Sequence, residues 1–208
     1  MLVVENGVDT DYFAFRPRLA LEPPNVVFVA SLAYRPNERA ALRLIREIMP
    51  KVRESVPQAR LWLVGGGPSP ALETEHDGRL TIVTGRVEDV RPYLDMAAVA
   101  CMPLTSGSGT KYKLLEALSA GVPVVCTSLT LDGLEGIVPG RHVLARDDDE
   151  GLAEGVLAWL KGNPPPSQSV EDARRVVESR YTWDRNLEKL APWLETIATL
   201  PVKGRRPG

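Results

Sequence analysis

The sequence predicts an α/β fold: a Rossmann-like, doubly wound parallel sheet of six strands with helices on both faces. Two observations support this prediction. Short apolar runs rich in β-branched residues alternate with longer segments of helical period, which is the order that parallel strands with crossover helices require. The runs contain few polar residues, which indicates strands that are covered on both faces.

The strands and helices follow from these patterns. We expect strands at residues 25–30, 60–64, 80–84, 99–103, 123–127 and 142–145. Apolar residues at three- and four-residue steps predict a helix between the first two strands, which Pro50 must kink or split because proline lacks an amide hydrogen. Further helices are expected at 90–97, 111–120, 150–161, 170–180 and 183–199. Gly121 is placed to cap the helix at 111–120.

The chain divides into four parts on this pattern. Residues 1–20 have turn chemistry without a strand–helix unit, so we expect an interdomain linker with a domain missing upstream. Residues 21–162 form the Rossmann-like domain. A proline-rich connector then leads into a C-terminal helical arm at 163–200, and the basic, breaker-rich residues 201–208 are expected to be a disordered tail.

Composition limits the classes of protein that the chain can be. Its 208 residues are 44% hydrophobic and 25% charged, with a formal charge of −2, which is typical of a globular protein and not of a general nucleic-acid binder. No apolar stretch reaches the roughly 20 residues that a membrane span needs. Cys101 and Cys126 lie inside apolar runs, which indicates inert thiols. We therefore expect a cytoplasmic protein, peripheral to the inner face of a membrane at most.

Two loops are the first candidates for a ligand site. In an open doubly wound sheet, ligands bind at the carboxyl ends of the strands where strand order reverses, which in a Rossmann order lies between the first and fourth strands. Residues 31–37 (SLAYRPN) and 104–110 (LTSGSGT) follow those strands. In the second loop, Gly107 and Gly109 let the backbone approach a ligand, and the next helix presents free amides and its positive dipole end.

Charged side chains at the start of this helix indicate an anion. Lys111 and Lys113 lie in its first turn, where the helix dipole disfavours cations unless an anion is bound. A plain turn with two solvated lysines is the alternative. Glu116 shares a helix face with Lys113, so it is either an ion-pair partner or a carboxylate that accepts hydrogen bonds from ribose hydroxyls.

Several other chemistries lack their motifs. The loop at 104–110 does not have the P-loop spacing, and no G-x-G-x-x-G follows the first strand, which argues against a nicotinamide or flavin cofactor. The glycines at 65–67 fit a tight turn as well as a ligand. We find no zinc spacing and no Ser/His/Asp triad, and the acidic run at 147–149 is explained by helix capping. We expect no metal and no cofactor.

Four segments, in order along the chain, resemble the family-4 (group 1) glycosyltransferases of the GT-B fold. Residues 107–127 (GSGTKYKLLEALSAGVPVVCT) are similar to the donor-binding signature lEAmA-x-G-x-PVV. Residues 5–13 (ENGVDTDYF), 61–68 (LWLVGGGP) and 84–93 (TGRVEDVRPY) are similar to three further motifs of the family. The YRPN at 34–37 and its context most resemble a subgroup tied to capsule or exopolysaccharide sugar transfer.

The resemblance implies that the chain is the C-terminal, donor-binding half of such an enzyme. Its donor substrate would be a nucleotide-diphosphate sugar, and the transfer would retain the anomeric configuration. The implied partner is a missing N-terminal acceptor domain that carries the catalytic histidine, so the isolated half is expected to bind donor without efficient transfer. A non-catalytic nucleotide-sugar-binding or interaction module and a GT-B sugar epimerase are the alternatives.

The resemblance also assigns residues. Glu116 matches the second glutamate of the family's Glu-x7-Glu pattern, which binds the ribose, whereas the first falls on Ser108 and leaves the sugar open. The family's basic residues after the first strand fall near Ser31 and Pro36, so another cation must bind the diphosphate. The candidates for it are Arg35, Arg39, Lys111 and Lys113, of which we favour Lys113. The expected catalytic residues are thus Lys113 and Glu116, and the expected donor-binding residues are Ser31, Arg35, Arg86, Val87, Gly107, Ser108, Gly109, Thr110 and Lys111.

Overall fold

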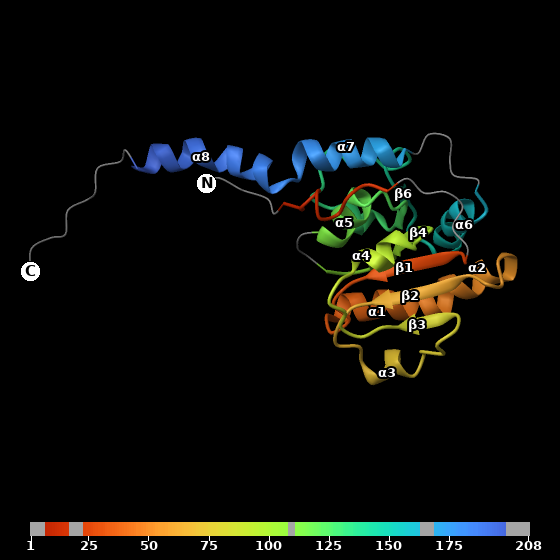
Figure 1. The fold of residues 1–208 in the computed structure, drawn as a ribbon. Helices are drawn as coiled ribbons and strands as arrows, with labels where there is room; N and C mark the ends of the chain where they lie inside the picture. The colour runs from red at the N-terminus through yellow and green to blue at the C-terminus, as the bar shows by residue number, and fades with distance from the viewer. Residues whose placement is uncertain (1–6, 17–22, 108–110, 163–168, 199–208) are drawn as a thin grey trace, which may run out of the picture.

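The computed structural model describes residues 7–16, 23–107, 111–162 and 169–198. Within these residues, six parallel strands form one sheet in the order β3-β2-β1-β4-β5-β6 (Figure 1). The strands are β1 (Asn25–Val29), β2 (Arg60–Val64), β3 (Thr81–Val83), β4 (Val99–Met102), β5 (Val124–Cys126) and β6 (Leu144–Ala145). The predicted fold class is confirmed, and the strand order reverses between β1 and β4.

Each predicted strand is present, and the apolar runs explain why. Val26, Val27 and Phe28 of β1 are fully buried, as expected for a central strand that is covered on both faces. The strand at the edge, β6, starts two residues later than predicted. The amides of Arg141 and His142 both donate to the carbonyl of Val138, so a turn occupies the residues that the prediction gave to the strand.

The helices cover both faces of the sheet. They are α1 (Arg35–Arg43), η1 (Leu44–Ile48), α2 (Met49–Ser55), α3 (Pro70–Glu73), α4 (Arg91–Asp95), α5 (Tyr112–Ser119), η2 (Ser128–Leu131), α6 (Asp149–Leu160), α7 (Val170–Arg180) and α8 (Trp183–Ala198). On one face, α6 packs against η1 and α2 over β4 and β5. On the other, α5 packs against β5 and carries α7 on its outer side (Figure 1).

The first helix shows the predicted effect of Pro50. The α-helical turns of α1 widen into a π-helical segment, η1, and regular helix resumes at Met49. Pro50 thereby occupies the first turn of α2, where the missing amide hydrogen costs least. The capping glycine is confirmed as well: Gly121 follows α5 with φ +74°, in the left-handed region that favours glycine.

Segments from both ends of the chain pack onto the body. The amide of Val8 donates to the carbonyl of Tyr181 at 2.6 Å, and Phe13 is buried. Ala173 and Val177 of α7 are fully buried, whereas α8 runs outward from the body (Figure 1) and exposes apolar side chains. The predicted disordered tail at 201–208 lies outside the described residues, and the four-part division of the chain stays a prediction.

Two further features concern the chain as a whole. Among the described residues, no helix is both long enough and apolar enough to cross a bilayer. The two cysteines are buried and unpaired, and burial raises the pKa of Cys101 to about 12 and that of Cys126 further. Both thiols are therefore unreactive, as the apolar runs around them predict.

Candidate functional site

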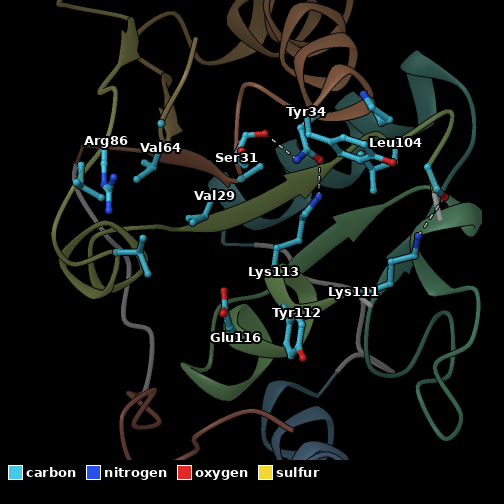
Figure 2. A pocket seen from close by; sticks show the side chains of 18 of the residues that line it. Val29, Ser31, Tyr34, Val64, Arg86, Leu104, Lys111, Tyr112, Lys113 and Glu116 are labelled. Atoms are coloured by element: carbon cyan, nitrogen blue, oxygen red, sulfur yellow. Dashed lines mark hydrogen bonds between the residues drawn. The ribbon is translucent and has the colours of Figure 1, made fainter. Parts of the chain in front are cut away.

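A cavity of about 440 Å³ opens at the carboxyl ends of β1 and β4, where the strand order reverses. The loop before α1, the glycine turn after β2, the 86–90 segment, the end of the β4 loop and the start of α5 surround it (Figure 2). This is the place where open α/β sheets bind ligands, because the loops after adjacent strands leave in opposite directions there. The cavity has room for part of a nucleotide.

Lys113 projects into this cavity from the first turn of α5. Its Nζ donates to Oδ1 of Asn37 at 2.6 Å (Figure 2) and lies 5.6 Å from the centre of the Phe28 ring. Burial and, to a lesser extent, the nearby Lys111 lower the pKa of Lys113 to about 8, and Glu116 opposes both. The side chain is therefore largely an ammonium at neutral pH, and it is one that a bound anion would stabilise.

Glu116 lines the same cavity one turn further along α5. Burial raises the pKa of its carboxyl group, and the positive charge of Lys113 lowers it. Within the described part of the chain, Lys113 donates to Asn37 and forms no ion pair with Glu116. The carboxylate is thus available to accept hydrogen bonds from a ligand's hydroxyl groups.

Two threonine hydroxyl groups bond to the backbone at the end of β4 and the start of the loop that follows it. Thr127 donates to the carbonyl of Leu104 at 2.7 Å, and Thr130 donates to that of Met102 at 3.1 Å. Gly107 has φ +115°, and a Cβ there would lie 3.3 Å from Pro36. The loop after β4 therefore approaches Pro36 closely at Gly107, and a glycine permits this approach because it has no side chain.

Lys111 immediately precedes α5 and is only 7% exposed. Its Nζ lies 3.5 Å from the carbonyl oxygen of Gly107, at the outer limit of a hydrogen bond (Figure 2). The ammonium thus faces back toward the loop that precedes its own helix. Together, Lys111 and Lys113 make this end of α5 strongly positive, which adds to the dipole of the helix.

The glycine turn after β2 closes another side of the cavity. Gly65 has φ +147°, and a Cβ there would lie 1.8 Å from the carbonyl oxygen of Ala30. Close packing against β1 therefore explains this glycine by itself, as the sequence allowed. Gly66 lies beside Arg86, and both line the cavity.

The structure brings most of the predicted site residues together. The predicted residues that line the cavity are Ser31, Arg86, Val87, Gly107, Lys111, Lys113 and Glu116. Arg35 is exposed and is not among the lining residues, because it lies on the opposite side of α1 from the buried Asn37. Ser108, Gly109 and Thr110 lie outside the described residues.

Some lining residues were not predicted. Tyr34 comes from the loop after β1 and Asn37 from the first turn of α1, whereas Ser106 comes from the loop after β4 and Tyr112 is the first residue of α5. Asn37 is the most informative of them: it is 5% exposed, and its Nδ2 donates to the carbonyl of Ser31 at 2.9 Å. A polar residue just after a proline in a candidate loop was the available signal, but its partner could not be read from the sequence.

Comparison with known proteins agrees with this site. A family model described as "Glycosyl transferases group 1" matches residues 23–162. The chain belongs to this family. The match includes the glycine turn after β2, the loop after β4 and α5, so every wall of the cavity lies inside the matched domain.

Curated relatives of this member of the group 1 family include mannosyltransferases. The chain is 27% identical to the phosphatidyl-myo-inositol mannosyltransferase of Mycobacterium leprae, over 94% of this chain and 54% of that protein. It is 29% identical to a GDP-mannose-dependent alpha-(1-6)-phosphatidylinositol monomannoside mannosyltransferase of Mycobacterium tuberculosis, over 90% of this chain and 54% of that protein. The chain thus spans about half the length of these relatives.

Solved structures show the same fold at low sequence identity. A glycosyltransferase from Rickettsia africae superposes with a TM-score of 0.76 at 15% identity, over 96% of this chain and 58% of that one. Anabaena HepE in complex with UDP-glucose superposes with a TM-score of 0.70 at 15% identity, over 96% of this chain and 57% of that one. The sheet with its helices is therefore that of known glycosyltransferases.

Proposed function

We propose that this chain is the donor-binding half of a glycosyltransferase that moves a sugar from a nucleotide-diphosphate sugar to an acceptor. The observation that carries the proposal is the pairing of Lys113 and Glu116 in one cavity at the start of α5. A half-buried ammonium beside a helix N-terminus suits a diphosphate. A carboxylate one turn away suits ribose hydroxyls, and Arg86 and Val87, which line the same cavity, are our candidates for contacts with the nucleobase.

The proposed chemistry makes Lys113 a stabiliser of the leaving group. When the anomeric C–O bond breaks, the bonding electrons stay on the β-phosphate oxygen, and positive charge develops on the sugar ring. The Lys113 ammonium and the amides at the start of α5 would act on that phosphate, and groups of this kind contribute about 3 kcal/mol each. Transfer would retain the anomeric configuration, and an acceptor domain would supply the remaining groups.

The names of the relatives guide the choice of donor. One relative is described as GDP-mannose-dependent, and HepE was solved with UDP-glucose, so GDP-mannose is our first candidate and UDP-sugars are the second. A phosphatidylinositol lipid as acceptor would follow from the mannosyltransferase names, and it would place the full-length enzyme at a membrane surface. Capsule or exopolysaccharide synthesis, suggested by the YRPN loop, is the alternative pathway.

Nucleotide binding tests the proposal directly. We expect titration calorimetry with UDP, GDP, ADP and dTDP to show binding of at least one of them. Lys113→Ala and Glu116→Ala should each lower the affinity for that nucleotide by tenfold or more, because each removes a charged contact. Lys161→Ala and Glu154→Ala, at exposed positions on and just after α6, are the matched controls and should leave the affinity unchanged.

Two experiments can give results that count against the proposal. Affinities that stay the same in both site variants would remove the assignment of Lys113 and Glu116. Incubation of the full-length enzyme with a panel of donor sugars separates the remaining functions, because transfer, an epimerised sugar and no reaction at all identify a transferase, an epimerase and a non-catalytic module, respectively.

A further inference from the structure

Asn37, in the first turn of α1, links the loop after β1 to the start of α5 across the strand reversal. Its amide makes two hydrogen bonds there: Nδ2 donates to the carbonyl of Ser31 at 2.9 Å, and Oδ1 accepts from Nζ of Lys113 at 2.6 Å (Figure 2). The backbone amide of Asn37 also donates to the carbonyl of Tyr34 at 2.8 Å. A side chain held in this way at 5% exposure has a fixed orientation.

The first of these hydrogen bonds determines the second. The carbonyl of Ser31 can only accept, so the NH₂ group of Asn37 must face it. The amide oxygen is then left to face the cavity, where it meets the ammonium of Lys113. Asn37 thus presents a neutral acceptor to a buried cation, and the fold of the loop after β1 fixes the direction of that acceptor.

A neutral acceptor matters because of what surrounds Lys113. The charged and titratable groups that line the cavity with it are Lys111, Arg86, Glu116, Tyr34 and Tyr112, and the Phe28 ring lies behind it. An aspartate at position 37 would form an ion pair and cancel the positive charge. An asparagine stabilises the ammonium of Lys113 without cancelling its charge. Two of the three N–H donors of the ammonium then remain for an anion.

The loop after β1 has no cation of its own in the cavity. Its arginine, Arg35, is exposed and outside the lining residues. The ammonium of Lys113, which comes from α5, is instead held against this loop by Asn37. The cation that faces the strand reversal therefore belongs to α5 and is anchored by Asn37 to the start of α1.

We propose that Asn37 is a positioning residue for phosphate binding, which holds the Lys113 ammonium against the loop after β1 and keeps it charged without neutralising it. This inference rests on the proposed function, since it assigns the same cavity to a nucleoside diphosphate. It extends that function by naming a neutral side chain, outside the charged pair, on which the affinity for the diphosphate depends.

The pH dependence of binding distinguishes positioning from a general structural role. Because Lys113 has a pKa of about 8, nucleoside diphosphate affinity should be constant near neutral pH and fall above pH 8. Asn37→Ala removes the acceptor that stabilises the ammonium, so the fall should begin at lower pH. Asn37→Asp adds a negative charge, so the fall should begin at higher pH, although the affinity at its maximum is reduced.

The experiment is titration calorimetry of the wild type and both variants between pH 6.5 and pH 9, with UDP and GDP as probes. The terminal phosphate of these probes ionises near pH 6, so its charge stays nearly constant over most of this range. At pH 7.5 we expect Asn37→Ala to bind at least fivefold more weakly than the wild type. Lys113→Arg is the control, because arginine stays protonated and should abolish the decline.

The outcomes distinguish this proposal from the proposed function on which it rests. If Asn37→Ala and Asn37→Asp weaken binding but leave the pH of the decline where it is in the wild type, Asn37 only supports the loop and the inference fails. If none of UDP, GDP, ADP and dTDP binds the wild type, or if Lys113→Ala binds as well as the wild type, the proposed function itself fails. Should Asn37→Ala not fold, the nearly isosteric Asn37→Asp carries the test.

Discussion

At the level of single residues, Lys113 serves binding at the expense of stability. A lysine ammonium that is partly removed from water and close to Lys111 is less stable than one in the unfolded chain, and its lowered pKa of about 8 reflects this. The hydrogen bond to Asn37 offsets only part of that cost. Binding sites commonly contain such residues, because the ligand supplies the missing interaction.

Lys113→Met should therefore stabilise the empty domain at neutral pH. The folded-state pKa of Lys113 is about 8 against 10.5 for the free side chain, so the unfolded chain binds more protons between these values. Below pH 8, keeping Lys113 charged in the folded state lowers the unfolding free energy by on the order of 3 kcal/mol. Lys113→Met avoids this cost but also loses the hydrogen bond to Asn37, so its net gain in stability is smaller. From pH 8 to pH 10.5 the wild type regains this stability.

Denaturant unfolding of both proteins at pH 7 and pH 10 measures the effect. We expect Lys113→Met to be more stable by about 2 kcal/mol at pH 7 and to lose most of that advantage at pH 10. A difference in unfolding free energy that is the same at both pH values would show that Lys113 is not a strained cation.

The charged residues of the site could be predicted from the sequence, but the side chain that holds them could not. Lys113 and Glu116 stand three residues apart in a helix that follows a glycine-rich loop, so their shared face follows from helical geometry alone. Asn37 contacts Lys113 across 76 positions of the chain. That contact depends on how two loops pack, and local spacing carries no information about it.

At the level of elements, the strands were predictable because burial on both faces leaves a continuous apolar run. The short helix α3 and the 3-10 turn η2 were missed, since a single turn has too few residues to show a helical period. The π-helical segment η1 was expected only as a kink or a break at Pro50. Pro50 follows this segment directly and lies in the first turn of α2, where a missing amide hydrogen costs least.

The turn after β2 shows how one element limits another, and Gly65→Ala tests it. A Cβ at this position would overlap the carbonyl of Ala30 at 1.8 Å, so the backbone of either β1 or the turn must move. We expect a loss of more than about 3 kcal/mol of unfolding free energy. Gly133→Ala is the control, because Gly133 also has a positive φ, +79° against +147° at Gly65, but open space around it.

Urea unfolding of the two variants gives the comparison. Gly133→Ala should lose about 1 kcal/mol, the usual cost of a left-handed alanine. Equal losses in the two variants would mean that backbone conformation alone, and not the contact with β1, requires glycine at position 65.

At the level of the whole molecule, one arginine ties together three distant parts of the chain. Arg174 lies on α7, and its side chain is only 12% exposed. Its guanidinium donates to the carbonyls of Thr10 and Phe13 in the N-terminal segment and to the carbonyl of Ser119 at the end of α5, at distances of 2.6 to 3.0 Å. Lysine could not make these contacts together, because they use the spread of the guanidinium group.

Arg174→Ala should loosen the N-terminal segment and lower the melting temperature. Three partly buried carbonyls each lose a donor, and we expect a cost of about 3 kcal/mol. Arg175→Ala changes the neighbouring arginine, which is 69% exposed, and should cost less than about 0.5 kcal/mol. Melting curves and the rate of tryptic cleavage after Arg16 measure both variants. Equal cleavage rates in the two would show that Arg174 does not anchor the segment.

The contact between Val8 and Tyr181 has a mechanical consequence. Val8 and Thr182 form a parallel bridge, so the chain enters the body and departs from it along neighbouring, equally directed paths. Tension between the incoming segment and α8 pulls these paths in opposite directions and loads the bridge in shear. The central sheet and the cavity at the carboxyl ends of β1 and β4 do not lie between the two loaded segments, so this force does not act on them directly.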